Sequence, residues 1–204
     1  MSAHSFTLGA VTPRATPLTP EQRRAALVEA TVPLLFQHGR NVTTRLIAEA
    51  AGVAEGTIFR AFGTKDELID AAIDAAMEPT RFEQDLREID LDASLEERLE
   101  ALVAAMQQRF ARVFLLLDKL GMVAPDKERR REFRERWDAR LKPRVSDVLG
   151  GDADRLRVEP DRALDVIRLL TFAGSHPGIA EGRTLTPPEI VDVLLNGLLE
   201  REDS

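Results

Sequence analysis

Apolar residues recur at helical spacing through most of this chain, and the first such stripe follows a clear start signal. Thr19, Pro20 and Gln22 combine a capping residue, a proline suited to the first helical turn and a side chain able to complete a capping box. The apolar positions that follow are Ala26, Leu27, Ala30, Leu34 and Leu35. Gly39 suits the end of this helix. We expect it to support the elements that follow.

Two short helices come next, from about Thr44 to Ala51 and from about Glu55 to Phe62. Thr43 is a suitable cap for the first of them, and Gly52 stands where a tight turn needs a positive φ. The positions expected to be buried between the helices are Ile47, Ala51, Val53 and Ile58. This order and spacing are typical of a helix-turn-helix, which places its second helix in the DNA major groove.

A fourth helix is predicted from Thr64, which forms a capping box with Glu67, up to Pro79. We interpret the acidic residues 79–93 as a linker or a frayed helix end. A long helix then carries apolar residues at Leu95, Leu99, Leu102, Met106, Phe110, Phe114, Leu117 and Leu120. A further helix follows Pro125, with four-residue spacing of Phe133, Trp137, Leu141 and Val145.

The last two predicted helices, residues 161–172 and 187–201, are apolar over much of their circumference. Two such helices from each of two chains would form a four-helix interface, so we expect a homodimer through them. The alternative is that both helices lie at the centre of one monomer. The predicted fold class is all-α, preceded by a disordered arm at residues 1–18, which are rich in Thr and Pro.

Composition and charge narrow the function classes. The 204 residues include no cysteine, and the three histidines show no metal-ligand spacing, so we expect no metal site and no cofactor. No apolar run reaches membrane-spanning length and no signal peptide is recognisable, so we expect a cytoplasmic protein. The net charge of -7 argues against indiscriminate binding to polyanions. Nucleophile–base pairs and phosphate loops are not recognisable either, so an enzyme is not expected.

The stretch TTRLIAEAAGVAEGTIFRAFGTKDEL, residues 43–68, closely resembles the head of the TetR/AcrR family of bacterial transcription regulators. The resemblance implies a DNA-binding head at residues 19–78 and a helical ligand-binding and dimerisation domain at residues 79–204. It also implies DNA contacts, at positions matching the family pattern, from Thr44, Arg45, Glu55, Gly56, Thr57, Arg60, Ala61 and Lys65. Arg60 is the best candidate for a bidentate bond to guanine, and Thr57 is suited to a base edge or a thymine methyl.

Three residues depart from the family pattern. Phe59 stands where a tyrosine is usual, Ala61 replaces a histidine or tyrosine, and Ala54 replaces the serine cap of the recognition helix. We expect Phe59, with its neighbours Ile58 and Phe62, to belong to the core. The loss of polar contacts predicts weaker phosphate binding or a flatter salt dependence.

The resemblance further implies a small-molecule pocket in the C-terminal domain, whose occupation moves the fourth helix. Candidate lining residues are large and apolar: Met106, Phe110, Phe114, Met122, Phe133, Trp137 and Phe172. Their alternative role is plain core packing. The segment 127–144 carries nine basic and four acidic residues, which favours an ion-paired helix face. The alternative is that Arg130 or Arg134 binds an anionic ligand.

The expected function is therefore that of a ligand-responsive transcriptional regulator. We expect a homodimeric repressor that binds a palindromic operator and is released by a small apolar or aromatic effector. The alternative is a nucleoid-associated or protein-interaction module that binds DNA without a small-molecule switch. Effector identity, operator sequence and the choice between repression and activation stay open.

Overall fold

The computed structural model describes residues 18–121 and 127–198, without the side chains at positions 127, 129, 130, 133, 134 and 138. Every regular element in this part of the chain is helical, so the predicted all-α class is confirmed. The first five helical elements are α1 (Pro20–His38), the 3-10 turn η1 (Gly39–Asn41), α2 (Thr44–Ala51), α3 (Gly56–Phe62) and α4 (Lys65–Met77). They pack around one buried cluster that contains Leu35, Ile47, Ile58, Phe62 and Leu68.

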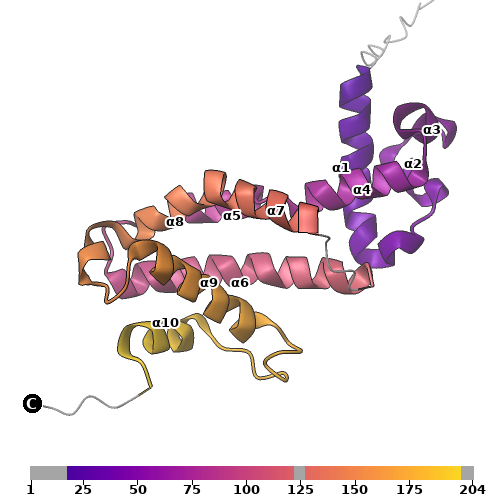
Figure 1. Cartoon of the computed structure of the whole chain (residues 1–204). Helices are drawn as coiled ribbons and strands as arrows, with labels where there is room; N and C mark the ends of the chain where they lie inside the picture. The colour runs from indigo at the N-terminus through magenta and orange to yellow at the C-terminus, as the bar shows by residue number, and fades with distance from the viewer. Residues whose placement is uncertain (1–17, 122–126, 199–204) are drawn as a thin grey trace, which may run out of the picture.

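The second half of the chain packs around a separate buried cluster. Its elements are α5 (Thr80–Arg87), α6 (Leu95–Lys119), α7 (Lys127–Arg136), the π-helix η2 (Trp137–Leu141), α8 (Lys142–Leu149), the 3-10 turn η3 (Gly150–Arg155), α9 (Pro160–Ser175) and α10 (Pro187–Asn196). Helix α6 is the central element, because it contacts α5, α8, α9 and α10. Figure 1 shows this long helix running through the C-terminal part of the molecule towards the head.

Several predicted boundaries are found where the local chemistry places them. Thr19 and Gln22 form the full capping box of α1, and Ser94 with Glu97 forms that of α6. Thr64 accepts a hydrogen bond from the Glu67 backbone N–H at 3.2 Å, which is the first half of the box predicted there. The starts of these helices were therefore predictable from residues three positions apart.

Two predicted element boundaries were wrong, and a third differs by one residue. Residues 79–93 are not simply a linker, because α5 lies within them and buries Phe82 and Leu86, which are four residues apart. The last helix ends at Asn196, since Gly197 has a φ of 79°. Helix α3 starts at Gly56, one residue after the predicted start at about Glu55, and its cap residue Glu55 makes no side-chain cap hydrogen bond.

Helix α6 also reaches into the head. Leu116, near its C-terminal end, is 1% exposed and belongs to the head's buried cluster. At Gly39, which has a φ of 56°, a Cβ atom would collide with the carbonyl oxygen of Lys119. Glycine is therefore needed here both for the backbone conformation and for the close approach of α6 to the end of α1.

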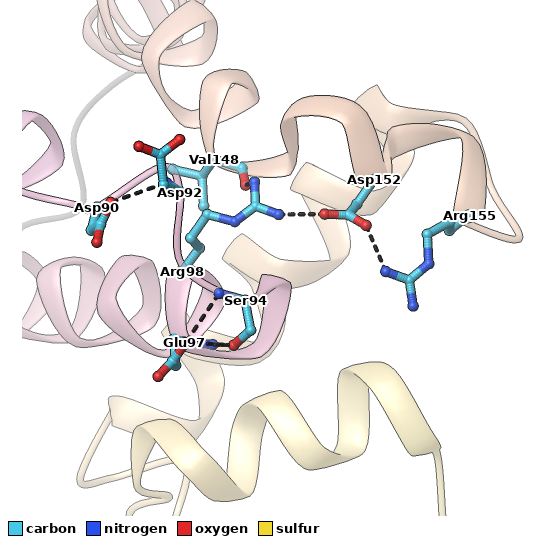
Figure 2. A network of polar contacts seen from close by, with 8 residues as sticks. All are labelled: Asp90, Asp92, Ser94, Glu97, Arg98, Val148, Asp152 and Arg155. Carbon is cyan, nitrogen blue, oxygen red and sulfur yellow. Dashed lines mark hydrogen bonds and ion pairs between the residues drawn. The ribbon is translucent and has the colours of Figure 1, made fainter.

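At its other end α6 is held by a buried arginine. Arg98 is 6% exposed and donates from Nη1 to the Val148 carbonyl at 2.7 Å, while its Nη2 pairs with Asp152. Figure 2 shows Arg98 between these two partners, with Arg155 on the far side of Asp152. Hydrogen bonding from Arg155, then from Arg98, lowers the pKa of Asp152, against an opposing effect of desolvation. This network fixes the start of α6 to the end of α8 and to η3.

Candidate nucleic-acid interface and effector cavity

The N-termini of α2 and α3 are joined by a hydrogen bond. Thr43 caps α2 by accepting a bond from the Leu46 backbone N–H at 3.2 Å, which places Thr44 and the exposed Arg45 in the first turn. The Thr44 hydroxyl donates to the carboxylate of Glu55, the residue that precedes α3. Two of the residues predicted to contact DNA, Thr44 in α2 and Glu55 just before α3, are therefore brought together.

The outer face of α3 carries the other residues predicted for base recognition. Gly56 and Arg60 are exposed, and Thr57 and Ala61 are half-buried. Arg60 donates from Nε to the carbonyl of Gly56, one helical turn earlier, at 3.2 Å. This bond uses one of the five guanidinium N–H donors, so the others remain available for a base edge.

We expected Phe59 to belong to the core, but in the structure its side chain is exposed. Ile58 and Phe62, four residues apart, take the inner face of α3 and are 0% and 2% exposed. Phe59 is turned away from that face and is 49% exposed. It lies next to Arg60 in sequence, on a helix whose outer face carries the predicted DNA contacts. The exposure of Phe59 could have been predicted from the four-residue spacing of Ile58 and Phe62, which assigns these two residues to the buried face.

Arg24 holds the end of α3 and was not identified from the sequence. Its guanidinium donates to the Ala61 carbonyl and lies 3.9 Å from the centroid of the Phe62 ring. Because Arg24 belongs to α1, these contacts fix the orientation of α3 relative to the supporting helix. We regard Arg24 as a positioning residue.

Lys65, predicted to bind a phosphate, is the first residue of α4. Its ammonium donates to the Arg40 carbonyl at 3.2 Å, and the Arg40 side chain pairs with Asp70 at 3.1 Å. An ammonium has three donors, so two remain for a phosphate. The exposed face thus carries cations whose described partners are mostly neutral backbone groups.

A cavity of about 580 Å³ lies between the end of α4, the middle of α6, the π-helix with α8, and α9. Apolar side chains form much of its wall, including Met77, Val113, Leu141, Val145 and Leu164. Its size falls within the range of ligand pockets in proteins. The π-helix contributes Trp137 and Leu141, and such local distortions of a helix are frequent at functional sites.

The structure separates the residues that were predicted to line a pocket. Phe110, Trp137 and Phe172 line the cavity. Met106 is 1% exposed and lies in the core cluster, in agreement with the alternative interpretation that it packs in the core. Phe114 lies beside the cavity, with its ring 6.1 Å from that of Phe110 and 5.0 Å from that of Phe172. Met122 and the side chain of Phe133 lie outside the described residues.

Ion pairs involve four basic side chains that are described in the segment 127–144: Arg131, Arg136, Arg140 and Lys142. Arg131 pairs with Glu135 at 3.5 Å, and Lys142 pairs with Asp161 at 2.6 Å. The side chains of Arg130 and Arg134, the predicted anion binders, lie outside the described residues. The ion-paired interpretation therefore holds for these four residues of the segment.

Three arginines surround the C-terminal end of α4, and we call Met77, Glu78, Arg109, Arg136 and Arg140 the α4-end cluster. Arg109 donates from Nη2 to the Met77 carbonyl at 3.3 Å. Glu78 pairs with Arg136 at 3.2 Å and with Arg140 at 2.8 Å. Hydrogen bonding to Glu78, then the charge of Glu83, raises the pKa of Arg140. This cluster could not be predicted from the sequence, because its partners lie far apart in the chain.

Two other kinds of site are absent from the part of the chain that the structure describes. Residues 18–121 and 127–198 contain no group of three or more His, Asp or Glu side chains placed to hold a metal ion. Within the same ranges, no helix combines the length and apolar character that crossing a bilayer requires.

Comparisons with known proteins agree with this geometry. Residues 27–72 match the family described as bacterial regulatory proteins, tetR family. FadR of Bacillus subtilis, solved in complex with stearoyl-CoA, is 17% identical, with a TM-score of 0.58 over 86% of this chain and 99% of its own. A protein named as a transcriptional regulator from Rhodococcus sp. RHA1 is 22% identical, with a TM-score of 0.54 over 85% and 93%.

A third solved structure is a protein named as a fatty acid metabolism regulator from Clostridium perfringens. It is 17% identical, with a TM-score of 0.54 over 86% of this chain and 100% of its own. At such identities these structures establish a shared fold, whereas the family match lies in the head itself. The match is to regulatory proteins, in line with the expectation that the chain is not an enzyme. Residues 27–72 thus match the tetR family of bacterial regulatory proteins, and the chain as a whole shares the fold of these solved structures.

Proposed function

We propose that this protein is a cytoplasmic, ligand-responsive transcriptional repressor that binds a palindromic operator as a homodimer. The observation that carries the proposal is the continuity of α6. Phe110 and Val113 of this helix line the cavity, and Leu116 of the same helix is buried in the head. A ligand that favours one position of α6 would therefore change the head through a rigid element.

The head recognises DNA through its exposed face on α2 and α3. Arg60 supplies a bidentate donor for guanine, and the exposed Phe59 ring supplies an apolar surface for a thymine methyl or a sugar. Arg45 and Lys65 bind phosphates, because they lie at the N-terminal ends of α2 and α4. Specificity depends mainly on α3, and register depends on the cations around it.

The homodimer forms through exposed apolar side chains of α9 and the end of α10. Val166, Leu169 and Phe172 are 38%, 52% and 37% exposed, and Leu198, just beyond α10, is 87% exposed. Ile190 and Val191 of α10, in contrast, are fully buried within the single chain. A second copy would cover the exposed residues by two-fold symmetry. Sedimentation at micromolar concentration tests this, and a monomer there would contradict it.

The apolar wall of the cavity supports a small apolar or aromatic effector. The solved FadR structure, which shares the fold, is a complex with stearoyl-CoA. This supports a ligand-binding role for the C-terminal half of the present chain.

The decisive experiment selects DNA sites from a random pool with the full chain, with and without a small-molecule extract. We expect a palindromic site with half-sites about 34 to 36 Å apart, or a related spacing, and release of this site by a component of the extract. A selected site that no extract component releases would favour the rival function, a nucleoid-associated or interaction module without a switch.

Two head variants sharpen this experiment. Arg60→Ala should weaken binding to the selected site by roughly 1 to 3 kcal/mol and relax preference at one base position. Lys65→Ala should weaken binding to all sequences by a similar factor and lower the salt dependence. Equal affinity of wild type and Arg60→Ala, measured at fixed salt, would remove Arg60 from the recognition face.

A further inference from the structure

The charges that line the cavity do not cancel. Among the described lining residues four are basic and three are acidic, and four minus three leaves a formal charge of +1. Three of the four cations have carboxylate partners that also line the cavity: Arg136 with Glu78 at 3.2 Å, Lys142 with Asp161 at 2.6 Å, and Arg168 with Asp165 at 3.7 Å. The fourth cation, Arg109, forms no ion pair with any described carboxylate.

Arg109 is a largely desolvated cation whose bonds are weak. Its one hydrogen bond to a described residue goes to the neutral Met77 carbonyl and is 3.3 Å long. Its guanidinium also lies 5.8 Å from the centroid of the Phe82 ring. Burial lowers the pKa of Arg109, and the charges of Glu78 and then Glu83 oppose this shift. A guanidinium stays protonated in proteins, so the side chain presents unused N–H donors near the cavity.

The present partner of Arg109 is the end of the helix that carries the head. Met77 is the last residue of α4, and a cation near a helix C-terminus is favoured by the helix dipole. Helix α4 packs on α1 and on the recognition helix α3. An anion that takes the Nη2 donor of Arg109 therefore competes with the Met77 carbonyl, which now holds the end of α4.

We propose that the cavity binds an organic monocarboxylate with an apolar or aromatic body, and that Arg109 exchanges the Met77 carbonyl for this carboxylate. The inference rests on the proposed function, whose effector it assigns to a chemical class. The single surplus positive charge matches one carboxylate better than a doubly charged phosphate group. The guanidinium fork binds a carboxylate through two parallel bonds, and Phe110, Trp137 and Phe172 provide the apolar wall.

The test uses matched acid and amide probes that share an apolar body. Octanoate, 4-phenylbutyrate and 1-naphthaleneacetate, each with its primary amide, are titrated calorimetrically at neutral pH into the full chain. The variants are Arg109→Gln and the control Arg112→Gln, which changes an exposed arginine of the same helix that does not line the cavity. We expect at least one acid to bind wild type about tenfold or more tightly than its amide.

This preference should fall to about twofold or less in Arg109→Gln and persist in Arg112→Gln. Hydrogen exchange provides a second readout: the binding acid should accelerate exchange in the last turn of α4 in wild type and leave it unchanged in Arg109→Gln. Three results would overturn the inference. They are the absence of acid preference in wild type for every pair, a preference that survives in Arg109→Gln, and acid binding without any change in α4.

Operator binding is followed in the same samples, so that failure of the inference is distinguishable from failure of the proposed function. A chain that binds its selected operator and releases it with an amide but not an acid remains a ligand-responsive regulator, yet the carboxylate assignment is wrong. A chain that selects no DNA site contradicts the proposed function itself, whatever the probes do.

Discussion

Helix α6 carries two buried or half-buried arginines about three turns apart, and their surroundings differ. Arg98 is fully enclosed, pairs with Asp152 and donates to the Val148 carbonyl. Arg109 lies beside a cavity and has only the Met77 carbonyl as its described hydrogen-bond partner. The Arg98 guanidinium forms an ion pair with a carboxylate, whereas the Arg109 guanidinium forms none with a described carboxylate.

The contacts of Arg98 are therefore fixed, whereas the contact of Arg109 with the Met77 carbonyl is exchangeable. Removing a partner from Arg98 leaves a buried charge uncompensated, so its contacts have to be kept in every state of the protein. The Met77 carbonyl is a neutral partner at 3.3 Å, and an anion is a stronger acceptor for the same donor. We infer that the start of α6 is an anchor and that its middle is where a ligand acts.

The largest predicted effect is on the anchor. Arg98→Met should lower the free energy of unfolding by about 3 kcal/mol, because it removes both the ion pair to Asp152 and the donor to the Val148 carbonyl. Urea denaturation measures the change. Arg112→Met, at an exposed position of the same helix, is the control and should stay within about 0.5 kcal/mol of wild type. An equal loss in both variants would mean that Arg98 is no anchor.

The next largest effect concerns the contact of α6 with the head. Gly39→Ala should cost about 1 to 3 kcal/mol of folding stability, since the added Cβ meets the Lys119 carbonyl and the backbone has a positive φ. It should also weaken the coupling between effector and operator binding. The matched control is Gly151→Ala, where an added Cβ meets nothing within 4 Å. Thermal unfolding with a release assay would measure both quantities.

A smaller effect is expected at the exchangeable arginine. Arg109→Gln removes one hydrogen bond to a neutral acceptor, so the free energy of unfolding should fall by only about 1 kcal/mol. The same variant should lose the response to a carboxylate effector. A stability loss as large as that of Arg98→Met would erase the distinction between the two arginines.

The smallest effect is a change with pH. The pKa of Asp152 is lowered in the folded state, chiefly by Arg155 and also by Arg98, so its contribution is fully present above the ordinary carboxyl pKa. That contribution is lost as the pH falls below about 4 towards the lowered pKa. The stability gap between wild type and Arg98→Met should therefore narrow on acidification. A gap that stays constant between neutral pH and pH about 3 would assign the effect of Arg98 to its bond to the Val148 carbonyl and to packing, and not to the ion pair with Asp152.

Much of the fold could be predicted because its signals are local. Capping pairs such as Thr19 with Gln22 lie three residues apart, and the apolar stripe of α6 follows one helical period. Helix α5 escaped prediction for the same reason, since eight residues with two buried apolar positions hardly define a period.

The polar contacts that distinguish the site could not be predicted from local patterns. Arg109 and Met77 are separated by 32 residues, and Arg98 and Asp152 by 54. A search for apolar stripes passes over both arginines because they are charged, although each lies three residues after an apolar position of the stripe, Leu95 and Met106. Phe59 shows that an apolar residue type alone does not predict burial. Its ring is apolar, but which face of a seven-residue helix it occupies depends on Ile58 and Phe62.

Trp137 has a practical consequence for following this protein in solution. It is the only tryptophan of a chain that contains no tyrosine, so intrinsic emission excited at the red edge of absorption comes from a single indole. That indole lines the cavity and stacks on Phe82, with ring centroids 6.1 Å apart. Entry of a molecule would change the polarity around it. The native chain thus contains its own unlabelled optical reporter, at the place where an effector would arrive.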